Sequence, residues 1–238
     1  MKIKGIVFDK DGTLLDYERC WIPVAEGAVD YVLARHPGEG VRARVIANLG
    51  ITEDGTVDID GPLCRGDYAG IGMAFIDGYR DAGYEVSVEA MARDIPAGFA
   101  ASRDRATVVP ICPNLKELLR RLRDMGISLG LITSDGADST TYTLSRLGVN
   151  GLFDVLLTHD DLQPAKPDPY FMGVFMQKTG LSPDEILMVG DTFADIDFGI
   201  NSGTHTLGVG RSEKNRSRLA KKAEFIGRDI SAVFDVIE

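Results

Sequence analysis

Four aspartates stand directly after two apolar runs of this sequence. Asp9 and Asp11 follow the run at 3–8, and Asp191 and Asp195 follow the run at 186–189. Carboxylates that gather in a small volume repel one another, and their pKa values rise. A hard divalent cation relieves this repulsion, and Mg²⁺ commonly takes one or two carboxylates together with a substrate phosphate. The spacing therefore predicts a Mg²⁺ site that handles a phosphate group.

The first two aspartates have a spacing that suits phosphoryl transfer. On an extended segment, Asp9 and Asp11 project to the same side. One carboxylate can then attack phosphorus, as aspartate nucleophiles do. The other can donate a proton to the leaving oxygen and later take one from water.

Groups that suit a phosphoryl dianion follow two other apolar runs. Thr133 and Ser134 follow the run at 127–132, and Lys166 precedes Pro167 beyond the run at 153–157. Hydroxyl, ammonium and free backbone N–H groups all bind phosphate oxygens. We expect Thr133 and Lys166 to bind the phosphoryl group, with Ser134 as an alternative donor.

The elements that must position these groups follow from hydrophobic periodicity. Strand-like runs alternate with helical stretches that mostly end at glycine. Strands are expected at 3–8, 127–132, 153–157, 186–189 and 204–209, helices at 115–125, 136–147, 169–179 and 195–201, and a last strand and helix within 224–236. The pattern predicts an α/β fold with a doubly wound, Rossmann-like parallel sheet. Ligands of such sheets bind at the carboxyl ends of the strands, where all these candidates fall.

The segment 16–105 differs from the rest of the chain. It contains 9 Arg, no Lys and 16 acidic residues, so it carries -7 of the total charge of -10. Helices are expected near 21–35, 65–82 and 86–100, with Pro96 kinking or ending the last of them. The stretch 36–64 has no clear pattern. We predict a separate, mostly helical module.

Composition excludes several kinds of partner. A net charge of -10 over 238 residues argues against binding to nucleic acid or to an anionic membrane. No apolar stretch reaches 18 residues, so no membrane span is predicted. The three cysteines are widely spaced, which argues against a disulfide framework or a zinc site and favours a cytoplasmic location.

Taken in order, the motifs resemble those of the haloacid dehalogenase (HAD) superfamily. The matching residues are Phe-Asp-Lys-Asp-Gly-Thr-Leu at 8–14, Thr133, Lys166 before Pro167, and Gly-Asp-x-x-x-Asp at 190–195. The resemblance points to the phosphatase branch, in the subgroup of phosphoglycolate phosphatases and β-phosphoglucomutases. It implies a core of 1–15 and 106–238, with a helical cap inserted at 16–105.

The resemblance also implies roles for the matching residues. Asp9 is the implied nucleophile and Asp11 the general acid and base, while Thr133 and Lys166 bind the phosphoryl group. The implied Mg²⁺ ligands are Asp9, the backbone carbonyl of Asp11, and Asp191, with Asp195 supporting the metal site through a bound water.

Lys10 departs from the usual family motif, and Arg65 lies in the inserted segment 16–105. Lys10 is less usual than an apolar residue between the two aspartates, and we expect it to point away from the site with no catalytic role. Caps of this kind close over the site, exclude water and select substrates. Arg65, between Cys64 and Gly66, is a weak candidate for pairing with a substrate carboxylate or second phosphate.

Several other polar groups have ordinary structural interpretations. Asp58-Ile59-Asp60-Gly61 has the same Asp-x-Asp-Gly pattern as the first motif, but no strand precedes it, so we predict a turn. Asp135 is expected to cap the helix that follows it. The three histidines are expected to be structural, and the basic run at 211–222 to be a solvated helix.

The sequence thus predicts a Mg²⁺-dependent phosphatase that acts on a small phosphorylated metabolite, similar to phosphoglycolate or a sugar phosphate, through an aspartyl-phosphate intermediate. The presence of Asp11 favours phosphate esters over dehalogenation. One alternative is a phosphoglucomutase-like phosphotransferase, because the cap and not the core selects the acceptor. Another is a non-catalytic ligand-binding or interaction protein on the same fold, against which the retained aspartates argue.

Overall fold

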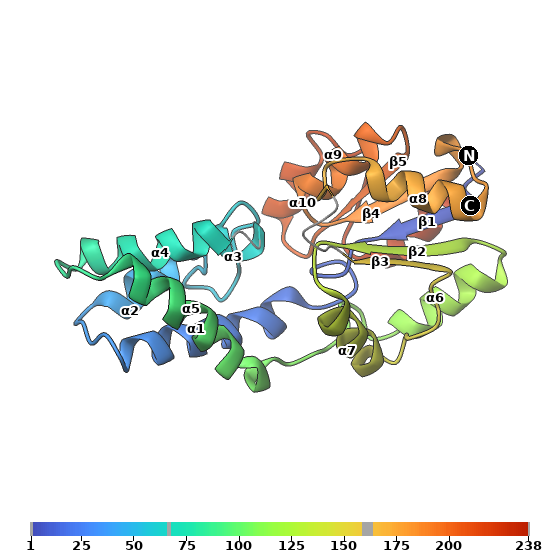
Figure 1. Ribbon diagram of the computed structural model, residues 1–238. Helices are drawn as coiled ribbons and strands as arrows, with labels where there is room; N and C mark the ends of the chain where they lie inside the picture. Colours follow the sequence, from blue (N-terminus) through green and yellow to red (C-terminus); the bar gives the residue numbers. More distant parts are fainter. Residues whose placement is uncertain (1, 66–67, 159–163, 238) are drawn as a thin grey trace. The chain divides into compact units, whose positions relative to one another are not determined.

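The computed structural model describes residues 2–65, 68–158 and 164–237. The chain divides into two compact units, one comprising Met1–Asp16 with Val108–Glu238 and the other comprising Tyr17–Thr107. Figure 1 traces both. Within the described ranges, no helix is long and apolar enough to cross a membrane.

The first unit is built on a six-stranded sheet with the strand order β3-β2-β1-β4-β5-β6. Its strands are β1 (Gly5–Phe8), β2 (Ser128–Thr133), β3 (Val155–Thr158), β4 (Ile186–Gly190), β5 (His205–Val209) and β6 (Phe225–Gly227). Every neighbouring pair is parallel, so all the carboxyl ends lie at one edge of the sheet. The predicted doubly wound α/β fold is confirmed.

Side chains of the central strands alternate between two apolar clusters. Ile6 and Phe8 of β1 belong to one cluster and Val7 to the other. In β4, Leu187 and Val189 join the first cluster while Ile186 and Met188 join the second. Because successive strand residues face opposite sides, this alternation places helices on both faces.

The covering helices sit as the clusters require (Figure 1). On one face lie α6 (Leu115–Asp124), α7 (Ala137–Leu147) and α11 (Val233–Ile237), and on the other lie α8 (Tyr170–Thr179) and α9 (Phe193–Asn201). Gly130 of β2 lets α8 come close, since a Cβ there would meet the Phe175 ring at 2.8 Å. The short helix α10 (Glu213–Leu219) precedes β6.

The second unit is helical. It consists of α1 (Tyr17–Leu33), α2 (Val41–Asn48), α3 (Pro62–Arg65), α4 (Tyr68–Asp81), α5 (Val88–Ala101) and a 3-10 turn at Arg103–Arg105. The five helices share one apolar core, which includes Val29, Val45, Phe75 and Met91. Gly98 allows α5 to pack closely on α1, because a Cβ at this position would lie 3.0 Å from the Ala28 carbonyl oxygen.

The structure adds two local details to what the sequence predicted for the second unit. The stretch 36–64, which showed no clear pattern, contains the whole of α2. Pro96 does not end its helix, since α5 continues to Ala101.

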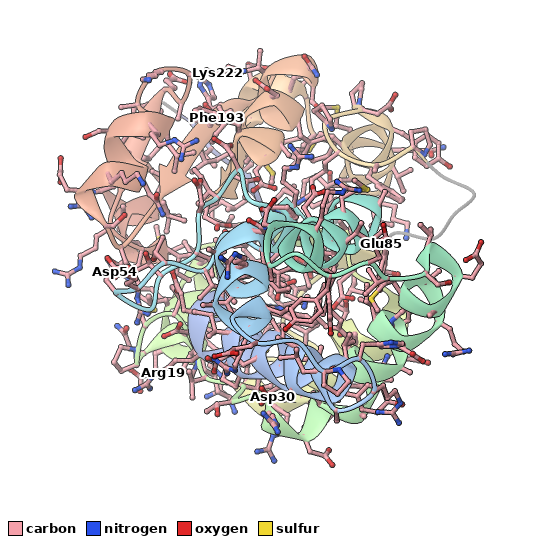
Figure 2. The ribbon with its side chains drawn as sticks, turned by 90° about the vertical axis from the view of Figure 1, so that its left-hand side faces the viewer. Arg19, Asp30, Asp54, Glu85, Phe193 and Lys222 are labelled. Atoms are coloured by element: carbon pink, nitrogen blue, oxygen red, sulfur yellow. The ribbon has the colours of Figure 1, made fainter. Side chains whose placement is uncertain are left out.

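Several acidic and basic side chains pair within their own unit, among them those of Asp30 and Lys222, which Figure 2 labels. Asp30 in α1 accepts hydrogen bonds from Arg42 at 3.0 Å and from Arg105 at 3.3 Å. In the first unit, Lys222 Nζ lies 5.4 Å from the centre of the Phe193 ring and 2.8 Å from Asp197. These surface charges are therefore paired within their own unit.

Candidate active site

The strand order places the first candidate motif at the middle of the sheet. β1 lies between β2 and β4, and Phe8 is in register with Leu131 on one side and Val189 on the other. The N–H of Asp9 donates to the Val189 carbonyl at 2.9 Å, which extends the pairing by one residue. The residues after β1, β2 and β4 therefore meet at one place.

Three carboxylates gather there. One oxygen from each of Asp9, Asp191 and Asp195 lies within 4.8 Å of the others. Lys166 points into the same cluster, with Nζ 2.5 Å from Asp9 Oδ1, 2.6 Å from Asp195 Oδ1 and 3.3 Å from the Ile132 carbonyl oxygen. The structure thus brings together Asp9, Asp191, Asp195 and Lys166.

The charges of this cluster shift the pKa values of its members. Burial raises the pKa of Asp9 to about 7, even though Lys166 acts to lower it. Burial, with Asp195 and Asp9 nearby, also raises the pKa of Asp191. Burial alone would lower the pKa of Lys166, but Asp195 and Asp9 more than offset that effect, so the ammonium stays charged. One lysine therefore neutralises only part of the charge of three carboxylates.

Two glycines allow the carboxylates to come so close. A Cβ at Gly12 would lie 2.1 Å from Asp191 Oδ2, and the backbone there has φ +78. A Cβ at Gly190 would lie 2.2 Å from the Cβ of Asp195. Thr13, which is fully buried, donates from Oγ1 to Asp191 Oδ1 at 3.1 Å. The glycines and Thr13 fix where Asp191 and Asp195 can lie.

Asp195 has two tasks. Its Oδ1 accepts a hydrogen bond from Lys166 Nζ. Its Oδ2 accepts hydrogen bonds from the Thr192 hydroxyl at 2.6 Å and from the Thr192 N–H at 3.1 Å. Since the N–H of Asp195 donates back to Thr192 Oγ1, the pair forms a capping box at the start of α9. Helix capping and orientation of Lys166 are thus combined in one side chain.

Two residues with hydroxyl groups lie at the end of β2. Thr133 is buried, and its Oγ1 accepts from the N–H of Asp135 at 3.1 Å. Ser134 is exposed in the same loop. The described structure gives both hydroxyls a place beside the strand end, and their binding of phosphate stays a prediction.

Lys10 differs from our expectation. Its side chain is 0% exposed, and Nζ lies 2.8 Å from Asp11 Oδ2 and 2.9 Å from Asp135 Oδ2. Asp135 does not cap α7: the helix starts after Gly136, and no side chain makes an N-cap hydrogen bond there. The sequence did not predict the contact between Lys10 and Asp135 because the two residues are more than 120 positions apart in the chain.

The carboxylate cluster suits a metal ion. Asp9, Asp191 and Asp195 offer only oxygen donors, and burial has already raised the pKa values of Asp9 and Asp191. A bound cation would favour their ionised forms and would polarise a phosphate oxygen. The carboxylate of Asp11 pairs instead with Lys10, which leaves its backbone carbonyl as the implied ligand.

The remaining candidates either stay predictions or make structural contacts within their own unit. Arg65 is an exposed residue at the end of α3, and its role in substrate selection stays a prediction. Asp58 Oδ1 accepts from the Asp60 N–H at 3.0 Å, which is a turn contact. Nε2 of His36 lies 2.8 Å from Asp94, and Nδ1 of His205 lies 2.7 Å from Glu224. His159 lies outside the described residues.

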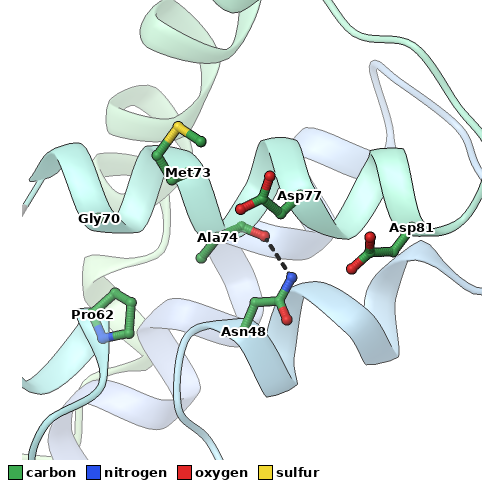
Figure 3. A pocket seen from close by; sticks show the side chains of 7 residues that line it. All are labelled: Asn48, Pro62, Gly70, Met73, Ala74, Asp77 and Asp81. Carbon is green, nitrogen blue, oxygen red and sulfur yellow. Dashed lines mark hydrogen bonds between the residues drawn. The ribbon is translucent and has the colours of Figure 1, made fainter.

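The second unit contains a groove of its own. It is lined by Asn48, Pro62, Gly70, Met73, Ala74, Asp77 and Asp81 (Figure 3). Asn48 donates across it to the Ala74 carbonyl oxygen at 3.3 Å. Its lining includes two carboxylates and no basic side chain, so its charge opposes phosphate binding. We do not assign substrate to this groove.

The chain belongs to the haloacid dehalogenase-like hydrolase family, whose model matches residues 3–203. The pyrophosphatase PpaX of Bacillus pumilus is 26% identical over 236 residues, covering 99% of this chain and 96% of that protein. A phosphoglycolate phosphatase of Vibrio vulnificus is 27% identical over 244 residues, with coverage of 99% and 96%. A crystal structure described as a predicted phosphoglycolate phosphatase, from Haemophilus somnus, superposes with a TM-score of 0.75 at 21% identity, covering 100% and 99% of the two chains.

Proposed function

We propose that this protein is a Mg²⁺-dependent phosphoric monoester hydrolase acting on a small phosphorylated metabolite. The observation that carries the proposal is the cluster of Asp9, Asp191 and Asp195 around Lys166 at the ends of the central strands. A cation held by the carboxylates, together with the ammonium, suits a phosphoryl dianion.

In the proposed reaction, an oxygen of Asp9 attacks phosphorus and the ester P–O bond breaks. Asp11 gives its proton to the departing oxygen. Water then attacks phosphorus of the aspartyl phosphate, gives a proton back to Asp11, and releases phosphate with the Asp9 carboxylate restored. Lys166 orients Asp9 throughout, because its Nζ lies 2.5 Å from Oδ1. Thr133, with Ser134 as the alternative, binds the phosphoryl oxygens.

Phosphoglycolate, a monoester, is the substrate to test first, because a relative with 27% identity is named for it. Pyrophosphate, an anhydride and not an ester, is the alternative, because a relative with 26% identity is named a pyrophosphatase. We assign substrate selection to a cap at 16–105, with Arg65 as a candidate contact, and retain 1–15 with 106–238 as the catalytic core. The proposed location is the cytoplasm; none of the three cysteines, all of which are described, forms a disulfide.

Hydrolysis of p-nitrophenyl phosphate, with and without Mg²⁺, tests the reaction. Wild type should turn over only with the cation, and Asp9→Asn should be inactive. Asp77→Asn, which removes an exposed carboxylate paired with Arg80, is the matched control and should stay active. Equal activity of Asp9→Asn and wild type, or no Mg²⁺-dependent turnover at any pH, would show the proposal to be wrong. Phosphate release from phosphoglycolate and pyrophosphate without a bisphosphate activator separates a hydrolase from a mutase.

A further inference from the structure

The buried ammonium of Lys10 joins two loops at the carboxyl end of the sheet. Its side chain is 0% exposed, and Nζ contacts Asp11 in the loop after β1 and Asp135 in the loop after β2, at 2.8 and 2.9 Å. Asp135 in turn donates its backbone N–H to Thr133 Oγ1 at 3.1 Å. One side chain therefore reaches both the second aspartate of the first motif and the loop of the phosphoryl-binding threonine.

The backbone around Lys10 is held as firmly as its side chain. Its carbonyl oxygen accepts from the N–H groups of Leu14 and Leu15 at 2.9 and 3.0 Å. Leu14 and Leu15 are themselves fully buried. The ammonium thus projects from a closed turn, and the carboxylates it contacts are fixed relative to that turn.

A buried ion pair is poor evidence for a purely stabilising role. Removing an ammonium from water costs several kcal/mol, and well-packed apolar residues often replace buried pairs with no loss of stability. Such a pair does fix direction, because each carboxylate oxygen must stay within hydrogen-bonding distance of the cation. Asp11 Oδ2 is held in this way, in a side chain that is 21% exposed.

We propose that Lys10 is a positioning residue, which aims the carboxylate of Asp11 for proton transfer by anchoring it to Asp135. The inference rests on the proposed role of Asp11 as general acid and base. Proton donation matters most when the leaving oxygen is strongly basic, so a misdirected Asp11 should slow poor leaving groups most.

A series of aryl phosphates of similar size tests this, namely p-nitrophenyl, phenyl and p-methoxyphenyl phosphate at saturating Mg²⁺. The measured quantity is kcat/KM, which reports the steps up to cleavage of the ester. For Lys10→Met, the loss relative to wild type should grow from a few-fold on p-nitrophenyl phosphate to about tenfold or more on p-methoxyphenyl phosphate. Asp135→Asn, which replaces the anchoring carboxylate with a neutral amide, should show the same trend with a smaller amplitude.

Because Lys10→Met leaves two carboxylates without their cation, the double variant Lys10→Met/Asp135→Asn is measured beside it. It removes one positive and one negative charge together, and its fold is checked by circular dichroism. A loss that is equal across the series in the folded variants, or no loss, would overturn the inference.

Asp11→Asn separates this inference from the proposed function. If Asp11→Asn is steeply sensitive to the leaving group and the Lys10 variants are not, the positioning role fails and the proposed reaction stands. If Asp11→Asn shows no such sensitivity, the acid and base role of Asp11 fails, and the positioning role with it.

Discussion

Replacing Asp9 with asparagine should stabilise the metal-free protein, by an amount that grows with pH. Asp9 is 7% exposed, and burial raises its pKa from 3.8 to about 7. A carboxyl whose pKa is higher in the folded state binds more protons when folded, so wild-type stability falls as the pH rises from about 4 to about 7. Asparagine carries no charge in this pH range, so the variant does not lose this stability as the pH rises.

The size of the effect follows from the two pKa values. Each pH unit between them corresponds to about 1.4 kcal/mol, so the ionised Asp9 costs the metal-free fold on the order of 4 kcal/mol above pH 7. From pH 5 to pH 7.5 this cost grows by about 2–3 kcal/mol. The stability gap between Asp9→Asn and wild type should widen by the same amount.

Urea unfolding in the presence of a chelator measures this gap. Far-UV circular dichroism is the suitable signal because both units contain helices, whereas the single tryptophan, Trp21, belongs to the second unit. Asp77→Asn is the control for the loss of one carboxylate, since its side chain is 42% exposed. Added Mg²⁺ should stabilise wild type much more than Asp9→Asn, because binding to the folded state adds to its stability.

The reasoning is refuted by a gap that stays constant or narrows between pH 5 and pH 7.5. That result would mean that burial does not disfavour the Asp9 carboxylate in the metal-free protein. Equal stabilisation of both proteins by Mg²⁺ would refute a different step, namely that Asp9 is a ligand.

Three further predictions concern neighbouring contacts. Lys166→Met should lower kcat by about a hundredfold or more, because it removes the ammonium that lies beside Asp9 and is proposed to bind the phosphoryl group. Steady-state kinetics at saturating Mg²⁺ checks this, and a change in KM with kcat unaltered would contradict it. Gly12→Ala should destabilise the protein by about 1–3 kcal/mol and weaken Mg²⁺ binding, since its φ is +78 and its Cβ would lie 2.1 Å from Asp191 Oδ2. Urea unfolding and Mg²⁺ titration measure both effects, with Gly126→Ala as a control at φ +79 where no atom lies within 4 Å of the added Cβ; equal losses would show that only backbone strain matters. Asp94→Asn should lower the thermal midpoint at pH 7, because hydrogen bonds from Arg93 and His36 hold the pKa of Asp94 below its ordinary value of 3.8. A lowered carboxyl pKa stabilises the fold above that value and the gain disappears as the pH falls further, so the difference from wild type should shrink below pH 4 and should not grow.

Local sequence pattern was enough for the framework of the first unit. Apolar runs such as 127–132 and 186–189 became β2 and β4 because their residues face two apolar clusters, one on each side of the sheet. A parallel sheet then places every strand end at one edge, which predicts where Asp9, Asp191 and Lys166 meet.

Local pattern was insufficient where stability comes from distant contacts. The helix α2 has a weak apolar face, and its buried residues Val41 and Val45 pack within the shared core of the second unit. Pro96 was expected to kink or end its helix, and it does not end it, since α5 runs on to Ala101. Tertiary packing outweighed local propensity at both places.

The sequence by itself determined which chemical groups stand at the strand ends and in what order. Only the tertiary structure decided how those groups pair. A lysine between two aspartates can point in several directions, and the choice depends on a carboxylate that another strand delivers. In this fold β2 lies beside β1, so Asp135 comes within 2.9 Å of Lys10, and the burial of the ammonium requires that contact because an unpaired charge inside the protein is too costly.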